Sequence, residues 1–425
     1  MTVPAEADLC IVGAGAAGLM AAVAAGRSMQ ANGTPGKIVA LDGAKTLGAK
    51  ILVAGGGRCN VTHWRVTESE YAVNRPAVRS VLRRFGADET VRFFAELGVE
   101  LKREETGKLF PVTDSARTVL NALLGAVHAA GASIIHPARV TSIVRSGDGF
   151  LVSGEWGSLH ARRVILATGG MALPRSGSDG AGYGFAQALG HSLTPAIRPA
   201  LVPLTLPAGH WITELSGLTV HAELVLRGPT GKRLVHFANS TLCTHFGLSG
   251  PSVLDISRYL LEARDREPGT TLSLNWMPGE TPEAADAWLL AAKGRGLLSV
   301  LRERLPERLA RAILAQARLA PDATVQQTPR DARRMLVDLL VATPLPIEGD
   351  RGFTHAEVTA GGVPIEEVDL GTMESLRCPG LSLCGEVLDV DGRIGGFNFQ
   401  WAWATGWIAG QSAMRAILPA PASTA

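Results

Sequence analysis

A glycine-rich turn near the N-terminus constrains the fold of this chain more than any other feature. Gly13, Gly15 and Gly18 form a GxGxxG pattern between an apolar strand expected at 9–12 and an Ala-rich helix expected at 16–30. In a βαβ unit, the first glycine permits the tight turn, the second leaves room for a pyrophosphate, and the third lets the helix pack on the sheet. The pattern predicts a parallel α/β sheet that binds a dinucleotide; the alternative is a packing turn without a ligand.

An acidic residue after the next strand narrows the choice of dinucleotide. This strand is expected at 37–41 and is followed by Asp42, 24 residues after Gly18. A carboxylate at this place accepts hydrogen bonds from ribose hydroxyls and disfavours a 2′-phosphate. NAD or FAD is therefore expected rather than NADP.

Three further segments favour FAD. A buried strand expected at 163–167 ends in a second turn, 168–170, which is placed to back the cofactor. The glycine-dense loop 48–60 carries two cations and an amide, which suit a long anionic ligand. The run 385–400 opens the last helix, expected at 398–417. A helix N-terminus directed at the flavin pyrimidine stabilises the negative charge that the reduced ring carries.

Several longer motifs carry a family resemblance. They are GAGAAGLMAA, GGGRCNVT, VILATGG, THFGLSGPSVLDIS, VTAGGV and CGEVLDVDGRIGGFNFQWAWATG. Over about residues 8–412 the chain resembles NAD(P)/FAD-dependent oxidoreductases described as aminoacetone oxidase-like or bile-acid dehydro-reductase-like flavoproteins. The resemblance implies non-covalent FAD. Two departures stand out: Asp42 occupies a place where many dinucleotide folds have Glu, and Phe397-Asn-Phe replaces the family's usual Tyr-Asn-Leu. Neither is expected to prevent FAD binding, and the second is expected to reshape the flavin pocket.

The fold class that follows is α/β. The resemblance implies a discontinuous Rossmann-like FAD-binding domain, an inserted β-barrel-like domain and a small helical domain within the barrel. The residue patterns agree, with strand-like alternation at 218–226 and helical spacing over 281–341. The expected boundaries are 1–194 and 353–425 for the FAD-binding domain, 195–277 for the barrel-like domain, 278–343 for the helical insert and 344–352 for the return through the barrel.

The residues expected to contact FAD come from all of these glycine-rich segments. Glu386 is expected to bind the ribityl hydroxyls, and Asn398 and Gln400 the flavin pyrimidine edge. The full set is Gly13, Gly15, Ala16, Ala17, Gly18, Asp42, Gly43, Lys50, Gly56, Gly57, Arg58, Cys59, Asn60, Val140, Ala167, Thr168, Gly169, Gly385, Glu386, Asp391, Gly395, Gly396, Asn398 and Gln400.

Few side chains offer catalysis, because the flavin itself carries the hydride chemistry. His245 lies in a turn-rich stretch expected to meet the flavin, and it is a candidate proton donor and substrate contact. The alternative is a turn histidine whose ring only hydrogen-bonds to the backbone. Cys59 is a second catalytic candidate, because it follows Arg58, a cation that would lower the pKa of its thiol. The alternative is that Cys59 is a small buried thiol without a catalytic role. Arg393 is a candidate partner of an anionic substrate or of the cofactor, and a surface salt bridge is the alternative for it and for Arg58.

The function expected is an FAD-dependent oxidoreductase that transfers a hydride between flavin N5 and an organic substrate where the FAD-binding and barrel domains meet. NAD(P)H is the expected reductant and binds transiently, because Gly180 to Gly184 lacks the spacing of a second dinucleotide turn. Two alternatives remain: an amine-type oxidase that uses oxygen, and a non-catalytic FAD-binding redox sensor or RNA-associated module.

Charge and cysteine usage bound the partners. The chain of 425 residues has 41 basic and 39 acidic residues and no block of like charge, so neither nucleic acid nor a membrane is an expected partner, only a small-molecule substrate. The arginines of 302–318 are read as a solvated face. Five cysteines without CxxC spacing predict no metal site and a reducing, cytoplasmic setting. The oligomeric state stays open.

Overall fold

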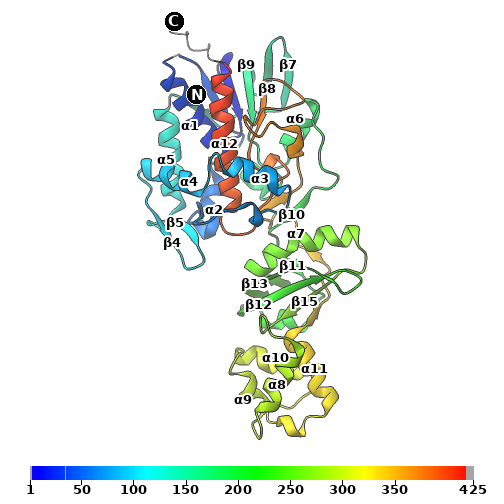
Figure 1. Cartoon of the computed structure of the whole chain (residues 1–425). Helices are drawn as coiled ribbons and strands as arrows, with labels where there is room; N and C mark the ends of the chain where they lie inside the picture. The colour runs from blue at the N-terminus through cyan, green and yellow to red at the C-terminus, as the bar shows by residue number, and fades with distance from the viewer. Residues whose placement is uncertain (1, 34, 418–425) are drawn as a thin grey trace. The chain divides into compact units, whose positions relative to one another are not determined.

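The computed structural model describes residues 2–33 and 35–417, and its contacts divide the chain into two compact units (Figure 1). The first unit contains the chain up to Pro199 and from Glu357 onward, and the second contains Ala200–Ala356. Each has its own hydrophobic core. The second unit holds both the strands expected for the barrel and the helices expected for the insert, and the finer boundaries between these parts stay predictions.

A seven-stranded sheet forms the centre of the first unit. Strands β6, β2, β1 and β9 lie in this order and run parallel, and β19 also pairs parallel with β9. On the other side of β9, strands β8 and β7 continue the sheet antiparallel. The strands are β1 (Glu6–Val12), β2 (Ile38–Leu41), β6 (Ser133–Ile135), β7 (Ser142–Ser146), β8 (Gly149–Gly154), β9 (Gly157–Leu166) and β19 (Leu381–Leu383).

The carboxyl ends of the parallel strands are level. Val12 pairs with Leu41 on one side and Leu166 on the other, and Leu166 also pairs with Leu383. The turns that follow these strands therefore leave from one edge of the sheet. This is the edge at which open α/β sheets bind ligands.

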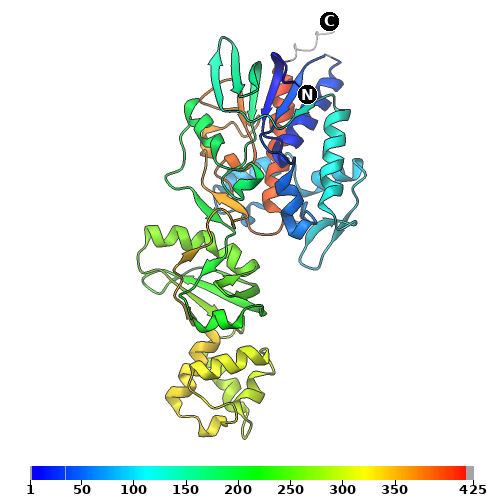
Figure 2. The ribbon, with the colours of Figure 1, turned by 180° about the vertical axis from the view of Figure 1, so that it is seen from behind.

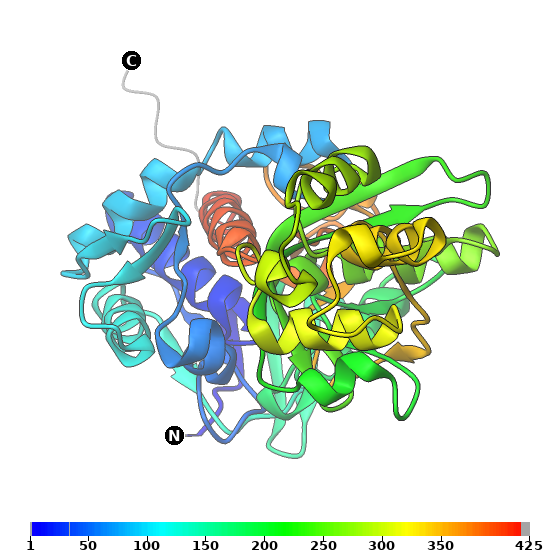
Figure 3. The ribbon, with the colours of Figure 1, turned by 90° about the horizontal axis from the view of Figure 1, so that it is seen from below.

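Two helices from opposite ends of the chain pack closely in this unit. A Cβ atom added at Gly406 or Gly410 of α12 (Phe397–Arg415) would lie 2.3 or 2.2 Å from the carbonyl oxygen of Ala17 or Ala21 in α1 (Ala16–Ala31). Glycines thus allow the two backbones to touch. Figures 1 and 2 show the helices side by side, and Figure 3 views α12 close to its axis with α1 beside it.

The remaining elements of the first unit surround this core. They are α2 (Ala49–Gly57), α3 (Arg75–Leu82), α4 (Ala87–Glu96), α5 (Ala116–Ala129), α6 (Ala181–Ala188), a three-stranded sheet of β3 (Thr62–His63), β5 (Lys108–Pro111) and β4 (Leu101–Arg103), and the paired strands β10 (Arg198–Ala200) and β18 (Val358–Ala360).

An antiparallel sheet forms the second unit, in the order β16-β15-β12-β13-β14-β11-β17. The predicted alternation is confirmed, because Val220, Ala222, Leu224 and Leu226 are buried in one core. The strands are β11 (Leu204–Thr205), β12 (Thr219–Arg227), β13 (Arg233–Thr244), β14 (Gly247–Ser249), β15 (Thr271–Asn275), β16 (Thr343–Leu345) and β17 (Gly349–Asp350).

Helices complete the second unit. They are α7 (Pro251–Arg266), which packs on β13 and β12, and α8 (Pro282–Ala291), α9 (Leu297–Leu301), α10 (Glu307–Gln316) and α11 (Arg330–Val341). Several arginines of this region are paired within the unit: Arg304 with Glu280, and Arg302 and Arg311 with Glu307. In the stretches that the structure describes, no helix is both long and apolar enough to cross a membrane.

Candidate functional site

The three glycines of the N-terminal turn differ in what surrounds them. A Cβ at Gly13, which has φ of 104°, would lie 2.4 Å from the carbonyl oxygen of Ala167, and one at Gly18 would lie 1.8 Å from that of Gly13. At Gly15 a Cβ would meet nothing within 4 Å. Gly13 and Gly18 are thus required by packing, whereas Gly15 faces open space in which a ligand can approach the backbone.

The N-terminus of α1 lies directly beside this space. It has neither a side-chain cap nor an acidic residue in its first turn, so no side chain of that turn neutralises the positive end of the helix dipole. Asp42 holds the turn in place, since its two carboxylate oxygens accept hydrogen bonds from the backbone N–H groups of Ala14 and Ala44, each at 2.7 Å. A carboxylate has further lone pairs for a ribose hydroxyl.

Three buried polar oxygens of the first unit have no hydrogen-bond partner. They are Oδ1 of Asn60, Oγ1 of Thr168 and Oγ of Ser178. Buried polar atoms in folded proteins are nearly always satisfied, so orphaned ones indicate a bound group or water. Ser178 was not predicted, although a Cβ at Gly169 would lie 2.7 Å from its Oγ; the polar run Ser-Gly-Ser-Asp soon after the second turn is the signal that marks it.

The N-terminus of α12 is a second helix start without a side-chain cap or a nearby acid in its first turn. Gly396, with φ of 93°, precedes α12, whose first turn likewise has neither a side-chain cap nor an acid. Because Gly406 lies against Ala17 and Gly410 against Ala21, α1 and α12 run parallel. At 1.5 Å per residue α12 extends about eight residues, or ~12 Å, beyond the start of α1. The positive N-terminal ends of α1 and α12, here called the two helix poles, suit a ligand with a diphosphate at one end and an electron-rich ring at the other.

The glycine loop supplies open backbone in the same unit. Helical dihedral angles in α2 break at Ala54, and Gly55, Gly56 and Gly57 all have positive φ. A Cβ at Gly56 would meet nothing within 4 Å. The orphaned Asn60 follows at once, so residues present in the chain fit an FAD molecule laid along this edge.

Comparison with known families agrees with this geometry. Residues 7–412 match the family described as HI0933-like protein Rossmann domain. The chain belongs to this family. It is an FAD-binding protein of an oxidoreductase family and holds FAD non-covalently.

Relatives and solved structures place the match along the whole chain. The 3-dehydro-bile acid delta(4,6)-reductase of Clostridium scindens is 33% identical over 415 residues, covering 95% of this chain and 98% of the relative. A ribosomal RNA dihydrouridine synthase of Escherichia coli is 32% identical over 413 residues, covering 96% and 98%. A 3-ketosteroid delta1-dehydrogenase structure from Sterolibacterium denitrificans has a TM-score of 0.52 at 11% identity, covering 97% and 100%, and supports the fold alone.

The comparisons do not support one expectation from the sequence, namely that nucleic acid is not a partner of this protein. A relative named for ribosomal RNA, similar over almost the entire chain, removes the ground for that exclusion.

Cys59 does not have the environment of a reactive thiol, so the predicted catalytic role is wrong. Its side chain is fully buried, and burial raises the pKa of the thiol to about 12. The neighbouring Arg58 is turned away to Glu104, at 2.6 Å, and to Asp114, at 3.6 Å, with its guanidinium over the ring of Phe110. The cation expected to activate Cys59 thus takes part in a surface ion-pair network.

Two amides predicted at the flavin pyrimidine are engaged elsewhere. Gln400 is fully buried; its Oε1 accepts from the hydroxyls of Thr62 and Thr90 and its Nε2 donates to the carbonyl of Phe85. The prediction for Gln400 is therefore wrong, because no surface is left for a ligand. Asn398 uses its amide on both backbone groups of Gly392, at 2.8 and 2.9 Å, and so closes the loop before α12 rather than offering a free edge.

The charged pair predicted near the ribityl chain is joined in the structure. Lys50 Nζ lies 2.5 Å from Oε2 of Glu386, whose Oε1 accepts from the N–H of Thr359. Contacts of both residues with FAD stay predictions, as do those of Asp391 and Arg393, Gly43 and Val140, Ala16 and Ala17, Gly385 and Gly395. His245 belongs to the second unit, where it is exposed in the turn between β13 and β14.

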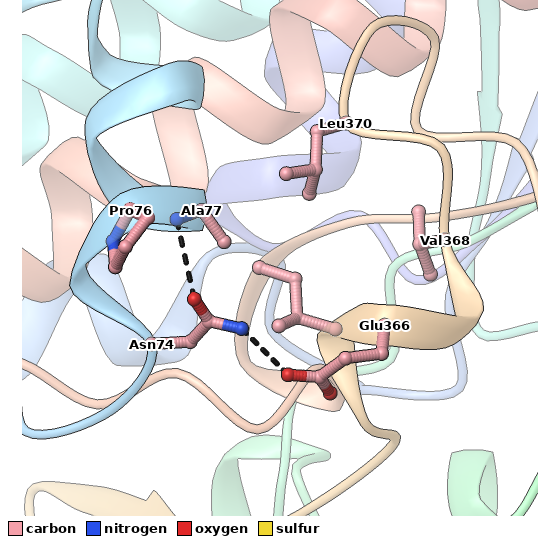
Figure 4. A pocket seen from close by; sticks show the side chains of 7 residues that line it. Asn74, Pro76, Ala77, Glu366, Val368 and Leu370 are labelled. Carbon is pink, nitrogen blue, oxygen red and sulfur yellow. Dashed lines mark hydrogen bonds between the residues drawn. The ribbon is translucent and has the colours of Figure 1, made fainter.

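A residue that the sequence reasoning missed lies at the start of α12. The ring of His63 stacks on that of Phe397 with centres 5.1 Å apart, and a Cβ at Gly396 would lie 2.7 Å from the backbone of Thr62. The signal was available, because His63 follows the glycine loop by only a few residues. A pocket of about 340 Å³ elsewhere in this unit, lined by Asn74, Pro76, Ala77, Ile365, Glu366, Val368 and Leu370, includes none of the predicted cofactor residues (Figure 4).

Proposed function

We propose that this protein is an FAD-dependent reductase of carbon–carbon double bonds conjugated with a carbonyl group, and that NAD(P)H supplies the electrons. When bound, FAD supplies the hydride chemistry at N5. The chain's own residues bind the cofactor and orient it: the N-terminus of α1 takes the diphosphate, and that of α12 takes the electron-rich ring.

One observation carries the proposal. Two relatives that match almost the entire chain have names that describe the same bond change on different molecules. A delta(4,6)-reductase of a 3-dehydro bile acid saturates double bonds near a ring ketone, and a dihydrouridine synthase saturates the ring double bond next to a uracil carbonyl. The shared chemistry supports a conjugated double bond as the substrate class, without choosing between a small molecule and RNA.

One glycine turn of the first unit bears on how the proposed reductant would bind. Gly180 precedes α6 with φ of 85°, but the N–H of Ala181 at the start of that helix already donates to Oδ1 of Asp179. A nicotinamide cofactor is therefore proposed to bind transiently and leave before the substrate enters.

Anaerobic stopped-flow absorbance of the flavin tests the proposal. We expect NADH or NADPH to bleach the FAD band, and a conjugated enone or a uridine-containing RNA to restore it. The two substrate arms separate a small-molecule enzyme from one that acts on RNA.

Other results would contradict the proposal. Reduction by amines with reoxidation by oxygen alone would favour an amine-type oxidase. Slow reduction with no reoxidation by any acceptor except oxygen would favour a redox sensor.

A further inference from the structure

One ion pair of the first unit joins the glycine loop to the ligand-binding edge of the sheet. Lys50, the second residue of α2, places its Nζ 2.5 Å from Oε2 of Glu386, which follows β19 by three residues. The two side chains are only 25% and 19% exposed. Because water screens such a pair less than a surface pair, its charges act strongly on a neighbouring group.

The carboxylate of Glu386 is fixed from two sides. Its Oε2 accepts from Lys50, and its Oε1 accepts from the N–H of Thr359 at 2.9 Å. The hydroxyl oxygen of Thr359 in turn accepts from the N–H groups of Met171 and Ala172, which follow the second glycine turn. This network orients the ammonium of Lys50, and only one of its three N–H donors has a partner among the described residues.

Hydrogen bonds to α12 show where Glu386 lies along that helix. The preceding residue, Gly385, donates its N–H to Oγ1 of Thr405 and accepts from Nε1 of Trp401. Trp401 belongs to the part of α12 that extends beyond the start of α1. The ion pair therefore lies alongside the N-terminal part of α12, the helix whose pole suits the electron-rich ring.

Lys50 is also the cation of the glycine loop that is directed to this edge. Arg58, the other cation of loop 48–60, is paired with Glu104 and Asp114. A helix N-terminus offers about half an elementary charge, so a full positive charge nearby adds to the stabilisation of an anion. The reduced flavin ring is such an anion.

We propose that Lys50, with Glu386 as its positioning residue, supplies the positive charge that stabilises the reduced ring of FAD. This inference rests on the proposed function, in which NAD(P)H reduces FAD. In that step a hydride passes from the nicotinamide carbon to flavin N5, the nicotinamide becomes its oxidised cation, and the electron pair displaced in the flavin leaves a negative charge at N1 and O2. The step is balanced without a proton. The ammonium of Lys50 stabilises the new charge, whereas the carboxylate of Glu386 opposes it.

The reduction potential of bound FAD tests the inference without any substrate. It is measured on each holoenzyme by equilibration with a reference dye during anaerobic reduction. We expect Lys50→Met to lower the potential and Glu386→Gln to raise it, each by at least a tenfold change in the reduction equilibrium, ~30 mV for a two-electron couple. Lys50→Arg should keep the potential near the wild-type value. The matched control is Lys102→Met, which removes another ion-paired lysine of the same unit and should leave the potential unchanged.

Opposite shifts in the two variants identify an effect of charge, since general damage to the site would move both potentials in one direction. Unchanged potentials, or shifts in the same direction, overturn the inference. Weaker FAD binding by Lys50→Met at the wild-type potential also overturns it, because Lys50 would then bind the diphosphate. Should Lys50→Met lose FAD, Glu386→Gln decides: a raised potential supports the inference, and an unchanged or lowered one overturns it.

The proposed function can fail independently of this inference. If the potentials shift in opposite directions but neither an enone nor RNA reoxidises the wild type, the role of Lys50 stands and the proposed reaction is refuted.

Discussion

At the scale of single residues, the glycines of the first turn give a matched pair of tests. Gly15→Ala adds a methyl group into open space, at a backbone φ of −78° that alanine adopts freely. We expect the apoprotein's free energy of unfolding to change by no more than about 1 kcal/mol, and FAD affinity to fall at least about tenfold. Gly18→Ala instead collides with the backbone of Gly13 and should destabilise the apoprotein by ~1–3 kcal/mol. Calorimetry and FAD titration measure both; Gly15→Ala with wild-type affinity contradicts the assignment.

Cysteine chemistry provides a pH test. All five cysteines are buried, and burial raises the pKa of Cys59 to about 12. Since only the thiolate is alkylated, raising the pKa moves reactivity to higher pH, and the native protein should resist iodoacetamide between about pH 7 and pH 9. Intact-mass analysis follows the labelling, with urea-unfolded protein as the control in which all five react. Fast labelling of Cys59 alone in the native protein would restore the reactive-thiol hypothesis.

Gln400 shows why some site residues escape sequence reasoning. Its position near the start of a glycine-preceded helix is typical of a ligand contact, but the side chain faces the interior and satisfies Thr62, Thr90 and Phe85. Which way a helical residue faces depends on partners distant in sequence. Gln400→Leu should therefore destabilise the protein by ~1–3 kcal/mol through orphaned polar groups while the FAD absorption spectrum stays unchanged. A shifted spectrum with unchanged stability would reverse this conclusion.

At the scale of elements, the contact between α1 and α12 sets how the two helix poles are aligned. Gly410→Ala places a methyl carbon 2.2 Å from the carbonyl of Ala21. We expect a loss of ~1–3 kcal/mol in stability, because overpacking forces the helices apart, together with weaker FAD retention. Gly125→Ala in α5, where a Cβ meets nothing within 4 Å, is the control and should stabilise the protein by up to about 1 kcal/mol. Equal melting temperatures for the two variants would refute the close contact.

Elements with a regular period were predictable and those defined by packing were not. The strand, turn and helix around Gly13 lie where the pattern predicts them, because apolar spacing and glycine placement are local signals. Helix α7 was not predicted, although Pro251 occupies its first turn, where the missing N–H of proline has no consequence. Helix α2 was hidden by its own glycines, which end it.

At the scale of the whole molecule, the FAD-binding unit is assembled from the two ends of the chain. The dinucleotide turn and the last helix are nearly four hundred residues apart in sequence, yet β19 joins the sheet beside β9 and α12 packs on α1. The sequence indicated this discontinuity through its glycine-rich ends and through the family resemblance.

The central claim is that one long ligand contacts the N-termini of both α1 and α12. Titration of the apoprotein with FAD and with FMN, followed by flavin fluorescence, tests it directly, because FMN lacks the adenosine half and the second phosphate. We predict one FAD bound per chain, with a dissociation constant at least about a hundredfold below that of FMN, a difference of ~2.7 kcal/mol. Equal affinity for the two flavins, or no binding of FAD at all, would contradict the claim.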